Sequence, residues 1–220
     1  MLRVKLAAAL ALGLCVCAAT AQTLDTEENR TLYAVGVVLG NNLVQFSLTP
    51  SELALVEAGL RDTVFGTEPR VDMNVYGQQI TALRDARQAA GAAAEKASSM
   101  AFIDEMALET GAERTASGLV YIVITEGTGA NPTAADTVRV HYHGTLRDGT
   151  VFDSSVDRGE PISFPLTGVI SCWTEGVQKM RVGGTSTLVC PSDTAYGDAG
   201  QGVIPGGAAL VFEVALLGIE

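Results

Sequence analysis

The period of the hydrophobic pattern changes near Gly118, and this change constrains the fold more than any other feature of the sequence. Before this point, apolar residues recur every three or four positions, which is typical of amphipathic helices. After it, short runs rich in β-branched and aromatic residues alternate with Gly, Pro, Asp and Asn. The sequence therefore predicts a helical part followed by an α+β domain over residues 112–220.

Residues 26–66 have the pattern of two short helices. One apolar stripe runs through residues 32–46 and a second through residues 53–64. Between them, Thr49-Pro50-Ser51-Glu52 is a helix start with proline near the first turn. Gly66 and Pro69 end this part of the chain.

Residues 72–111 predict one long helix, because they lack proline and are rich in good helix formers. Arg87 interrupts the apolar stripe, and its alanines offer little apolar surface for packing against a second helix. We therefore expect a solvent-bridging spacer arm rather than a coiled coil. The helix should end near Thr110-Gly111, where glycine suits a C-cap. The residues of the expected stripe are Tyr76, Ile80, Leu83, Ala90, Ala94, Ala97 and Ala101.

The remaining chain predicts an antiparallel sheet with one short helix. Asp148-Gly149 is a hairpin signal, so the strand that follows should pair with the strand before it. The helix is expected from Cys172 to Met180, with Trp173 and Val177 on one face. The strand-like runs cover residues 118–124, 137–144, 162–166, 185–190 and 209–219.

The first 21 residues have the features of a secretory signal peptide. The basic segment MLRVK precedes an apolar run too short to cross a bilayer, and Ala19-Thr20-Ala21 fits the cleavage pattern. A lipid anchor on Cys15 or Cys17 is the alternative, although bulky residues precede both cysteines. We expect the mature chain to begin near Gln22 in an exported, oxidising compartment. No later stretch has the length and apolarity of a membrane span.

Removal of the signal leaves Cys172 and Cys190. An even pair in an oxidising compartment predicts one disulfide. Two buried thiols that pack as small hydrophobic groups are the alternative.

The charge of the chain argues against nucleic-acid binding. Its formal net charge is −11, and no basic face is available to neutralise phosphates. An acidic balance by itself indicates solubility and no particular partner.

Both histidines of the chain lie in one predicted strand. Alternation places Val138, Val140 and Tyr142 on the inward face and turns His141 and His143 outward as surface residues. No third histidine is available to complete a metal site, so we expect neither a metal nor a cofactor. Ser154 and Ser155 are expected to have no histidine partner on their side of the sheet, which argues against nucleophilic catalysis.

Three separated motifs resemble the FKBP-type peptidyl-prolyl isomerases. They are FDSS at 152–155, VISCWTEGVQKMRVGG at 169–184, and AYGDAGQGVIPGGAALVFEVALL at 195–217. YAVGVVLGNN at 33–42 and LVEAGLRDTVFG at 55–66 are similar to the helical dimerisation domain of the macrophage infectivity potentiator group of exported bacterial members. The resemblance implies a dimerisation domain at 22–71, a connecting helix at 72–111 and an isomerase domain at 112–220.

The family fold is a curled antiparallel sheet around one short helix, with an apolar pocket between them. The resemblance makes Trp173 the pocket floor and places Asp153 and Tyr196 at its rim, and these three are the implied catalytic residues. Residues Gly200–Gly207 would form a flap over the substrate, with Ile204 pointing into the pocket. The Ile170 N–H would bind a ligand carbonyl. The implied substrate-binding walls are Tyr142, Phe152, Phe164, Val169, Ile170 and Phe212.

Two departures from the family pattern have structural consequences. Cys172 stands where the family often has glycine, which strengthens the expectation of a Cys172–Cys190 bridge. The glycine pair at 206–207 predicts a looser flap.

The resemblance implies a peptidyl-prolyl cis-trans isomerase that assists the folding of exported proteins. Its partners would be proline-containing unfolded or partly folded chains, and the N-terminal helices would form a homodimer. The alternative is a dimeric periplasmic holdase-type chaperone in which isomerisation is secondary. The long helix motivates this alternative, since a lone catalyst needs no spacer.

Overall fold

The computed structural model describes residues 23–220, which divide into two compact units on either side of the Val44–Gln45 bond. The expected signal peptide, with Cys15 and Cys17, lies outside the described residues. Within residues 23–220, no helix combines the length and the apolarity needed to cross a membrane.

The described part of the first unit is built on helix α1, Glu27–Leu43. Thr26 caps this helix, since its side chain accepts a hydrogen bond from the Asn29 N–H. No residue of α1 is buried, although much of its surface is apolar. The large exposed apolar residues of α1 are Leu32, Tyr33, Val35, Val37, Val38 and Leu39.

The second unit begins with two helices joined by an ion pair. Helix α2, Pro50–Val64, starts as the sequence predicts, with a capping box between Thr49 and Glu52. Helix α3 spans Met73–Met106, and Asp72 caps its N-terminus. The Arg87 guanidinium lies 2.6 Å from the Glu52 carboxylate, so the residue that interrupts the expected stripe links α3 to α2. A short 3₁₀ helix, η1, covers Val44–Phe46.

The buried face of α3 differs from the predicted stripe. Ala90, Ala94, Ala97 and Ala101 are exposed, whereas Ala92, Ser99 and Ile103 are buried. The prediction was wrong because alanine carries too little apolar surface to mark a face, and the buried face includes a serine. The helix also ends at Met106, before Thr110, and its last turns pack on the sheet.

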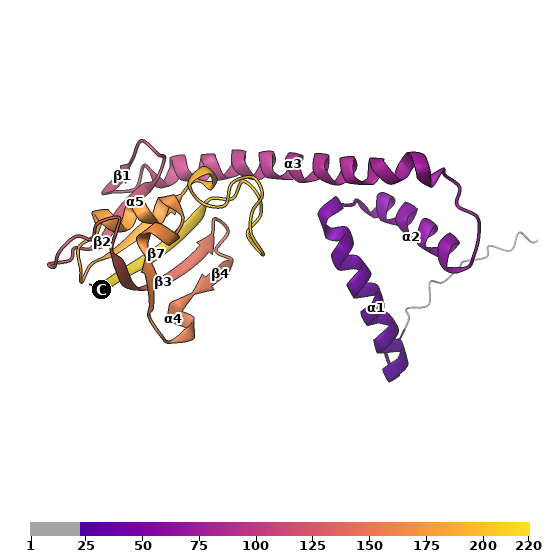
Figure 1. The fold of residues 1–220 in the computed structure, drawn as a ribbon, viewed down its shortest axis with the longest axis horizontal. Helices are drawn as coiled ribbons and strands as arrows, with labels where there is room; N and C mark the ends of the chain where they lie inside the picture. The colour runs from indigo at the N-terminus through magenta and orange to yellow at the C-terminus, as the bar shows by residue number, and fades with distance from the viewer. Residues whose placement is uncertain (1–22) are drawn as a thin grey trace, which may run out of the picture. The chain divides into compact units, whose positions relative to one another are not determined.

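The C-terminal residues form one antiparallel seven-stranded sheet in the order β1-β2-β6-β7-β3-β4, with β5 paired to β3. Figure 1 labels β1, β2, β3, β4 and β7 of this sheet and the helix α5. This arrangement confirms the predicted α+β class. The hairpin at Asp148-Gly149 also forms as expected, and Gly149 has a φ of +85°. The strands are β1 (Ala112–Arg114), β2 (Val120–Thr125), β3 (Thr137–Leu146), β4 (Val151–Ser154), β5 (Ile162–Pro165), β6 (Thr185–Cys190) and β7 (Leu210–Ile219).

One helix, α5 (Ser171–Lys179), packs on this sheet and completes the core. It contributes Trp173 and Val177 to a cluster that includes Val138 and Val140, so the inward face predicted for β3 is confirmed. Short helices complete the connections: α4 (Ser155–Arg158), η2 (Leu166–Gly168) and η3 (Ser192–Thr194).

A disulfide joins Cys172 at the start of α5 to Cys190 at the end of β6, with Cα atoms 5.7 Å apart. Both cysteines are fully buried. The bridge therefore fixes the N-terminal end of α5, immediately before Trp173, to the sheet.

We predict that replacing both cysteines with alanine lowers the free energy of unfolding of the domain by about 3 kcal/mol, because a bridge of this loop length restricts the unfolded chain. Urea denaturation of the oxidised parent and the variant measures the change. Reductant, added under unfolding conditions, should shift the parent and leave the variant unchanged. Equal midpoints for parent and variant would contradict the prediction.

The Glu52–Arg87 pair should make the stability of the helical region depend on pH. The Arg87 guanidinium, with help from the Thr49 N–H, lowers the pKa of Glu52 from 4.5 to about 2. Because the folded pKa lies below the unfolded one, the contribution is complete above 4.5 and is lost as pH falls through about 2. Thermal unfolding followed by circular dichroism should show Glu52→Gln to be less stable at neutral pH, with the difference from the parent shrinking as pH falls through about 2.

Glu57→Gln is the matched control, since it makes the same chemical change on α2 away from Arg87. If Glu52→Gln stayed less stable than the parent by the same amount in acid, its effect would not come from the ionised Glu52–Arg87 pair.

Candidate active site

A pocket of about 380 Å³ opens between the sheet and the N-terminal end of α5. It brings together the residues that the sequence analysis placed in a pocket, with Ile204 as the exception. Most of its wall is aromatic. The lining residues are Tyr142, Phe152, Asp153, Phe164, Gly168, Val169, Ile170, Trp173, Tyr196, Gln201 and Phe212.

Trp173 lies at the centre of the aromatic set. Its ring centroid is 5.4 Å from Tyr142, 5.7 Å from Phe164 and 5.3 Å from Phe212, each in an edge-to-face arrangement. Such contacts hold the rings in one geometry, because the edge of one ring is attracted to the face of another. The Trp173 indole N–H is buried and has no hydrogen-bond partner among residues 23–220. Unpaired buried donors are rare in folded proteins and destabilise them, so this one is a feature of the pocket that stability does not explain.

Gly144 in β3 makes room for the Phe152 wall. A Cβ at this position would lie 2.7 Å from Phe152 Cζ and 2.9 Å from Cε2, closer than side-chain carbons approach. The ring of Phe152 then meets Phe212 edge to face, with centroids 5.4 Å apart. A side chain at 144 would displace this wall of the pocket.

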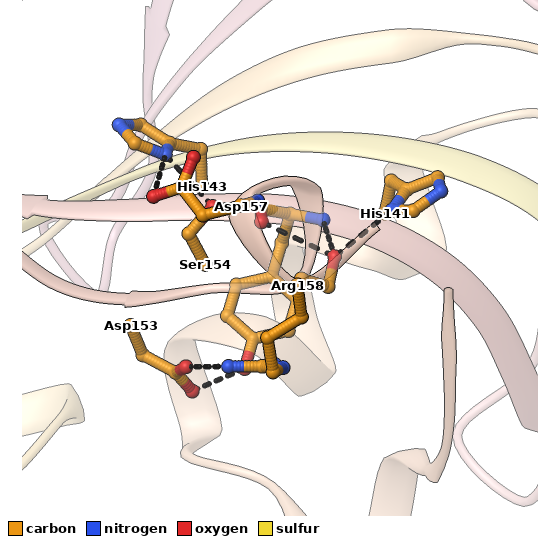
Figure 2. A network of polar contacts seen from close by, with 8 residues as sticks. His141, His143, Asp153, Ser154, Asp157 and Arg158 are labelled. Carbon is orange, nitrogen blue, oxygen red and sulfur yellow. Dashed lines mark hydrogen bonds and ion pairs between the residues drawn. The ribbon is translucent and has the colours of Figure 1, made fainter. Parts of the chain in front are cut away.

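Three polar groups form a network at the rim, drawn in Figure 2. The Tyr142 hydroxyl donates to Asp153 Oδ2, and Arg158 from α4 donates to Asp153 Oδ1. Arg158 Nη2 also donates to the Tyr142 hydroxyl at 3.1 Å, and its guanidinium carbon lies 5.8 Å from the centre of the Tyr142 ring. The carboxylate therefore accepts one bond on each oxygen, which fixes its orientation.

The rim network shifts the pKa of each member. Burial alone would raise the pKa of Asp153, but the hydrogen bonds from Tyr142 and Arg158 outweigh burial and lower it. Burial and the bond to Asp153 raise the pKa of Tyr142. At neutral pH the site therefore holds an ionised Asp153 and a neutral Tyr142.

The histidines of β3 do contact the serines, which corrects the sequence analysis. His141 Nδ1 lies 3.1 Å from Ser155 Oγ, and His143 Nδ1 lies 3.0 Å from Ser154 Oγ (Figure 2). Both histidines are half-buried rather than plain surface residues. Alternation in β3 places both histidines correctly. Ser154 is the last residue of β4 and pairs with His143 across the hairpin, and Ser155 is the first residue of α4.

These serines support the backbone and are not placed for nucleophilic attack. The buried Ser155 Oγ accepts the Tyr142 N–H at 2.8 Å, and the buried Ser154 Oγ accepts the Asp157 N–H at 3.1 Å as the N-cap of α4. They hold α4, and with it Arg158, beside the pocket.

No cluster of three or more metal-binding side chains occurs in the part of the chain that the structure describes.

Sequence reasoning missed Arg158, Gly168 and Gln201. Arg158 lies five residues after Asp153, and a basic residue close behind an acid was the available signal. Gln201 is the flap residue that lines the pocket, whereas Ile204 is buried in the core beneath it. Gln201 gave no signal, because a single uncharged polar residue in a loop belongs to no periodic or charge pattern.

Two family models match the chain over most of its described length. Residues 129–217 match the FKBP-type peptidyl-prolyl cis-trans isomerase domain. Residues 28–123 match the domain that lies amino-terminal to the FKBP-type peptidyl-prolyl isomerase.

Two relatives and one solved structure match this chain over nearly their full length. The FKBP-type 22 kDa peptidyl-prolyl cis-trans isomerase of Escherichia coli is 41% identical over 91% of this chain and 99% of its own. The outer membrane protein MIP of Legionella longbeachae is 34% identical and covers 100% of this chain and 99% of its own. The crystal structure of FkpA from Escherichia coli superposes with a TM-score of 0.71 at 33% identity, over 90% of this chain and 99% of that one. With its aromatic pocket in the domain that the family model matches, this chain belongs to the FKBP-type peptidyl-prolyl cis-trans isomerases.

Proposed function

We propose that this isomerase accelerates the folding of exported proteins by binding a prolyl segment in the aromatic pocket and stabilising the twisted imide. The observation that carries the proposal is the set of aromatic rings around Trp173 in a pocket with a fixed carboxylate at its rim. No covalent bond and no proton transfer are required.

The physical chemistry of the reaction matches an apolar pocket. The barrier to rotation about the X–Pro bond comes from amide resonance, which is lost as the bond twists. The planar amide is more polar than the twisted one, so water stabilises the ground state more than the transition state. A pocket that removes water from the prolyl imide and fits the twisted form lowers the barrier.

The polar groups then orient the substrate. The Ile170 N–H lies at the N-terminus of α5, where backbone donors lack partners within the helix, and can bind a substrate carbonyl. The Tyr196 side chain lines the same pocket. Asp153 is a source of negative potential rather than a base, since its lowered pKa leaves it a weak proton acceptor.

Two further parts of the proposal concern where and in what state the protein works. The N-terminal signal pattern and the Cys172–Cys190 bridge support an exported protein in the oxidising periplasm. The exposed apolar surface of α1 supports a homodimer, since an amphipathic helix of this length gains stability mainly by burying its apolar face. The same surface favours the second candidate function, a holdase that retains unfolded chains.

The pocket assignment is tested by peptide cis/trans isomerisation with residues 22–220. We expect Trp173→Ala to lower kcat/KM by about a hundredfold and Tyr196→Phe by about three- to tenfold, because the first removes the floor and the second only a hydroxyl. Tyr33→Phe on α1 makes the same chemical change as Tyr196→Phe outside the pocket and should have no effect. Folded pocket variants that retain the parent rate would contradict the assignment.

The role of α1 is tested by the paired substitutions Leu32→Glu and Leu39→Glu. These residues lie on one side of α1, and Asn41→Glu on the other side is the control. We expect the pair to convert a dimer to a monomer in light scattering with little change in peptide isomerisation, because buried charges oppose association. A monomeric parent would contradict the dimer.

The same paired variant tests the holdase function. If it no longer suppressed aggregation of an unfolded protein but kept its isomerase activity, holding unfolded chains would be the main activity.

A further inference from the structure

The last turns of α3 form part of the isomerase domain. Ala92, Ser99 and Ile103 are only 6%, 2% and 2% exposed. Their spacing of seven and four residues puts them on one face of the helix. Ile103 packs in a core cluster with Val120 and Val189 of the sheet. This segment of α3, residues 92–103, is therefore fixed to the domain that holds the pocket.

The same segment touches the end of the flap. A Cβ on Gly207 would lie 2.2 Å from Ala92 O and 2.8 Å from Lys96 N, and one on Gly206 would lie 3.1 Å from Ala92 Cβ. Gly207 also has a φ of +82°, which favours glycine. The glycine pair that was expected to loosen the flap thus allows the flap to pack directly against the helix backbone.

Polar contacts fasten the helix on both sides of the flap. The buried Ser99 Oγ accepts the Ala209 N–H at 2.7 Å, just after the flap. Lys96 Nζ lies 2.5 Å from Asp193 Oδ1 and 3.8 Å from Asp198 Oδ1, just before it. The Gly207 N–H donates to Gly197 O at 2.9 Å and joins the two ends.

The segment between these contacts carries part of the pocket wall. Asp193 and Asp198 lie on either side of Tyr196, and Gln201 follows within the flap. The Gly197 N–H donates to Ser192 O at 2.8 Å, so the chain around Tyr196 is held at its base. A shift of α3 at Lys96 would therefore move two residues that line the pocket.

A second contact links α3 to the opposite wall. Glu95 accepts two hydrogen bonds from Arg147, at 2.9 and 3.2 Å, at the hairpin between β3 and β4. These strands carry Tyr142, Phe152 and Asp153. Glu95 and Lys96, neighbours on α3, thus contact the two segments that carry opposite walls of the pocket.

We propose that residues 92–103 of α3 are a flap anchor, in which Lys96 and Ser99 are positioning residues for the isomerase pocket. The anchor sets the position of Tyr196 and Gln201, so the connecting helix positions the flap for binding a prolyl segment. The inference rests on this pocket being the substrate site. It gives the helix a function beyond that of a spacer.

The test uses the full mature chain with Lys96→Met, which keeps the apolar stem and removes the charge. We expect KM for a proline-containing peptide to rise about two- to fivefold, the range that a partly exposed ion pair can supply, with little change in thermal stability. Amide hydrogen exchange should become faster in residues 196–207 and stay unchanged in β3 and β7. Lys96→Arg should restore both measurements, since it restores the charge.

Arg84→Gln is the matched control, because Arg84 lies on α3 away from the flap and pairs with Asp85. Ser99→Ala is the second variant, since it removes the acceptor of the Ala209 N–H and should also speed exchange next to the flap. Unchanged KM and unchanged exchange in 196–207 would overturn the anchor. Faster exchange spread evenly over the sheet would also overturn it, because that result marks a purely structural role. If the parent itself lacks isomerase activity, the exchange measurement alone decides on the anchor while the proposed function fails.

Discussion

The packing of Trp173 between the sheet and the open pocket is the constraint on which the rest of the structure depends. Its indole meets the rings of Tyr142, Phe164 and Phe212 edge to face and lines the pocket. The disulfide one residue before it fixes the start of α5 to β6, and Gly144 allows Phe152 to close the wall. These contacts form an apolar floor, in which the indole N–H has no hydrogen-bond partner among residues 23–220.

The rim solves a different problem, which is to keep a charge beside an apolar pocket. Asp153 is only partly buried, and its carboxylate is held by Tyr142 and Arg158. The Ser154 cap places α4, and α4 places Arg158. His141 contacts Ser155 and His143 contacts Ser154, so the histidines contribute to the geometry of the site without lining the pocket.

Much of the fold could be predicted, because burial leaves a periodic signal. Alternating valines in β3, the Thr49–Glu52 capping box and the Asp148-Gly149 turn each depend on neighbours within a few residues. Local pattern could not identify the pocket walls, because Tyr142 and Phe212 come from strands that are far apart in the sequence and pair only in the folded sheet. Those walls were identified through the family resemblance and not through the pattern.

The sequence by itself determined the acidic charge of the chain, the order of its main helices and strands and the inward face of β3, since composition, local propensity and periodicity decide these features. The short elements β1 and α4 were not predicted. Only the tertiary structure decided the partners of Asp153, the histidine–serine contacts and the buried face of α3. Each of these is a contact between segments that meet after the chain folds back, such as Lys96 with Asp193. An exposed lysine or a serine on a helix has many possible environments, and only the folded chain selects one.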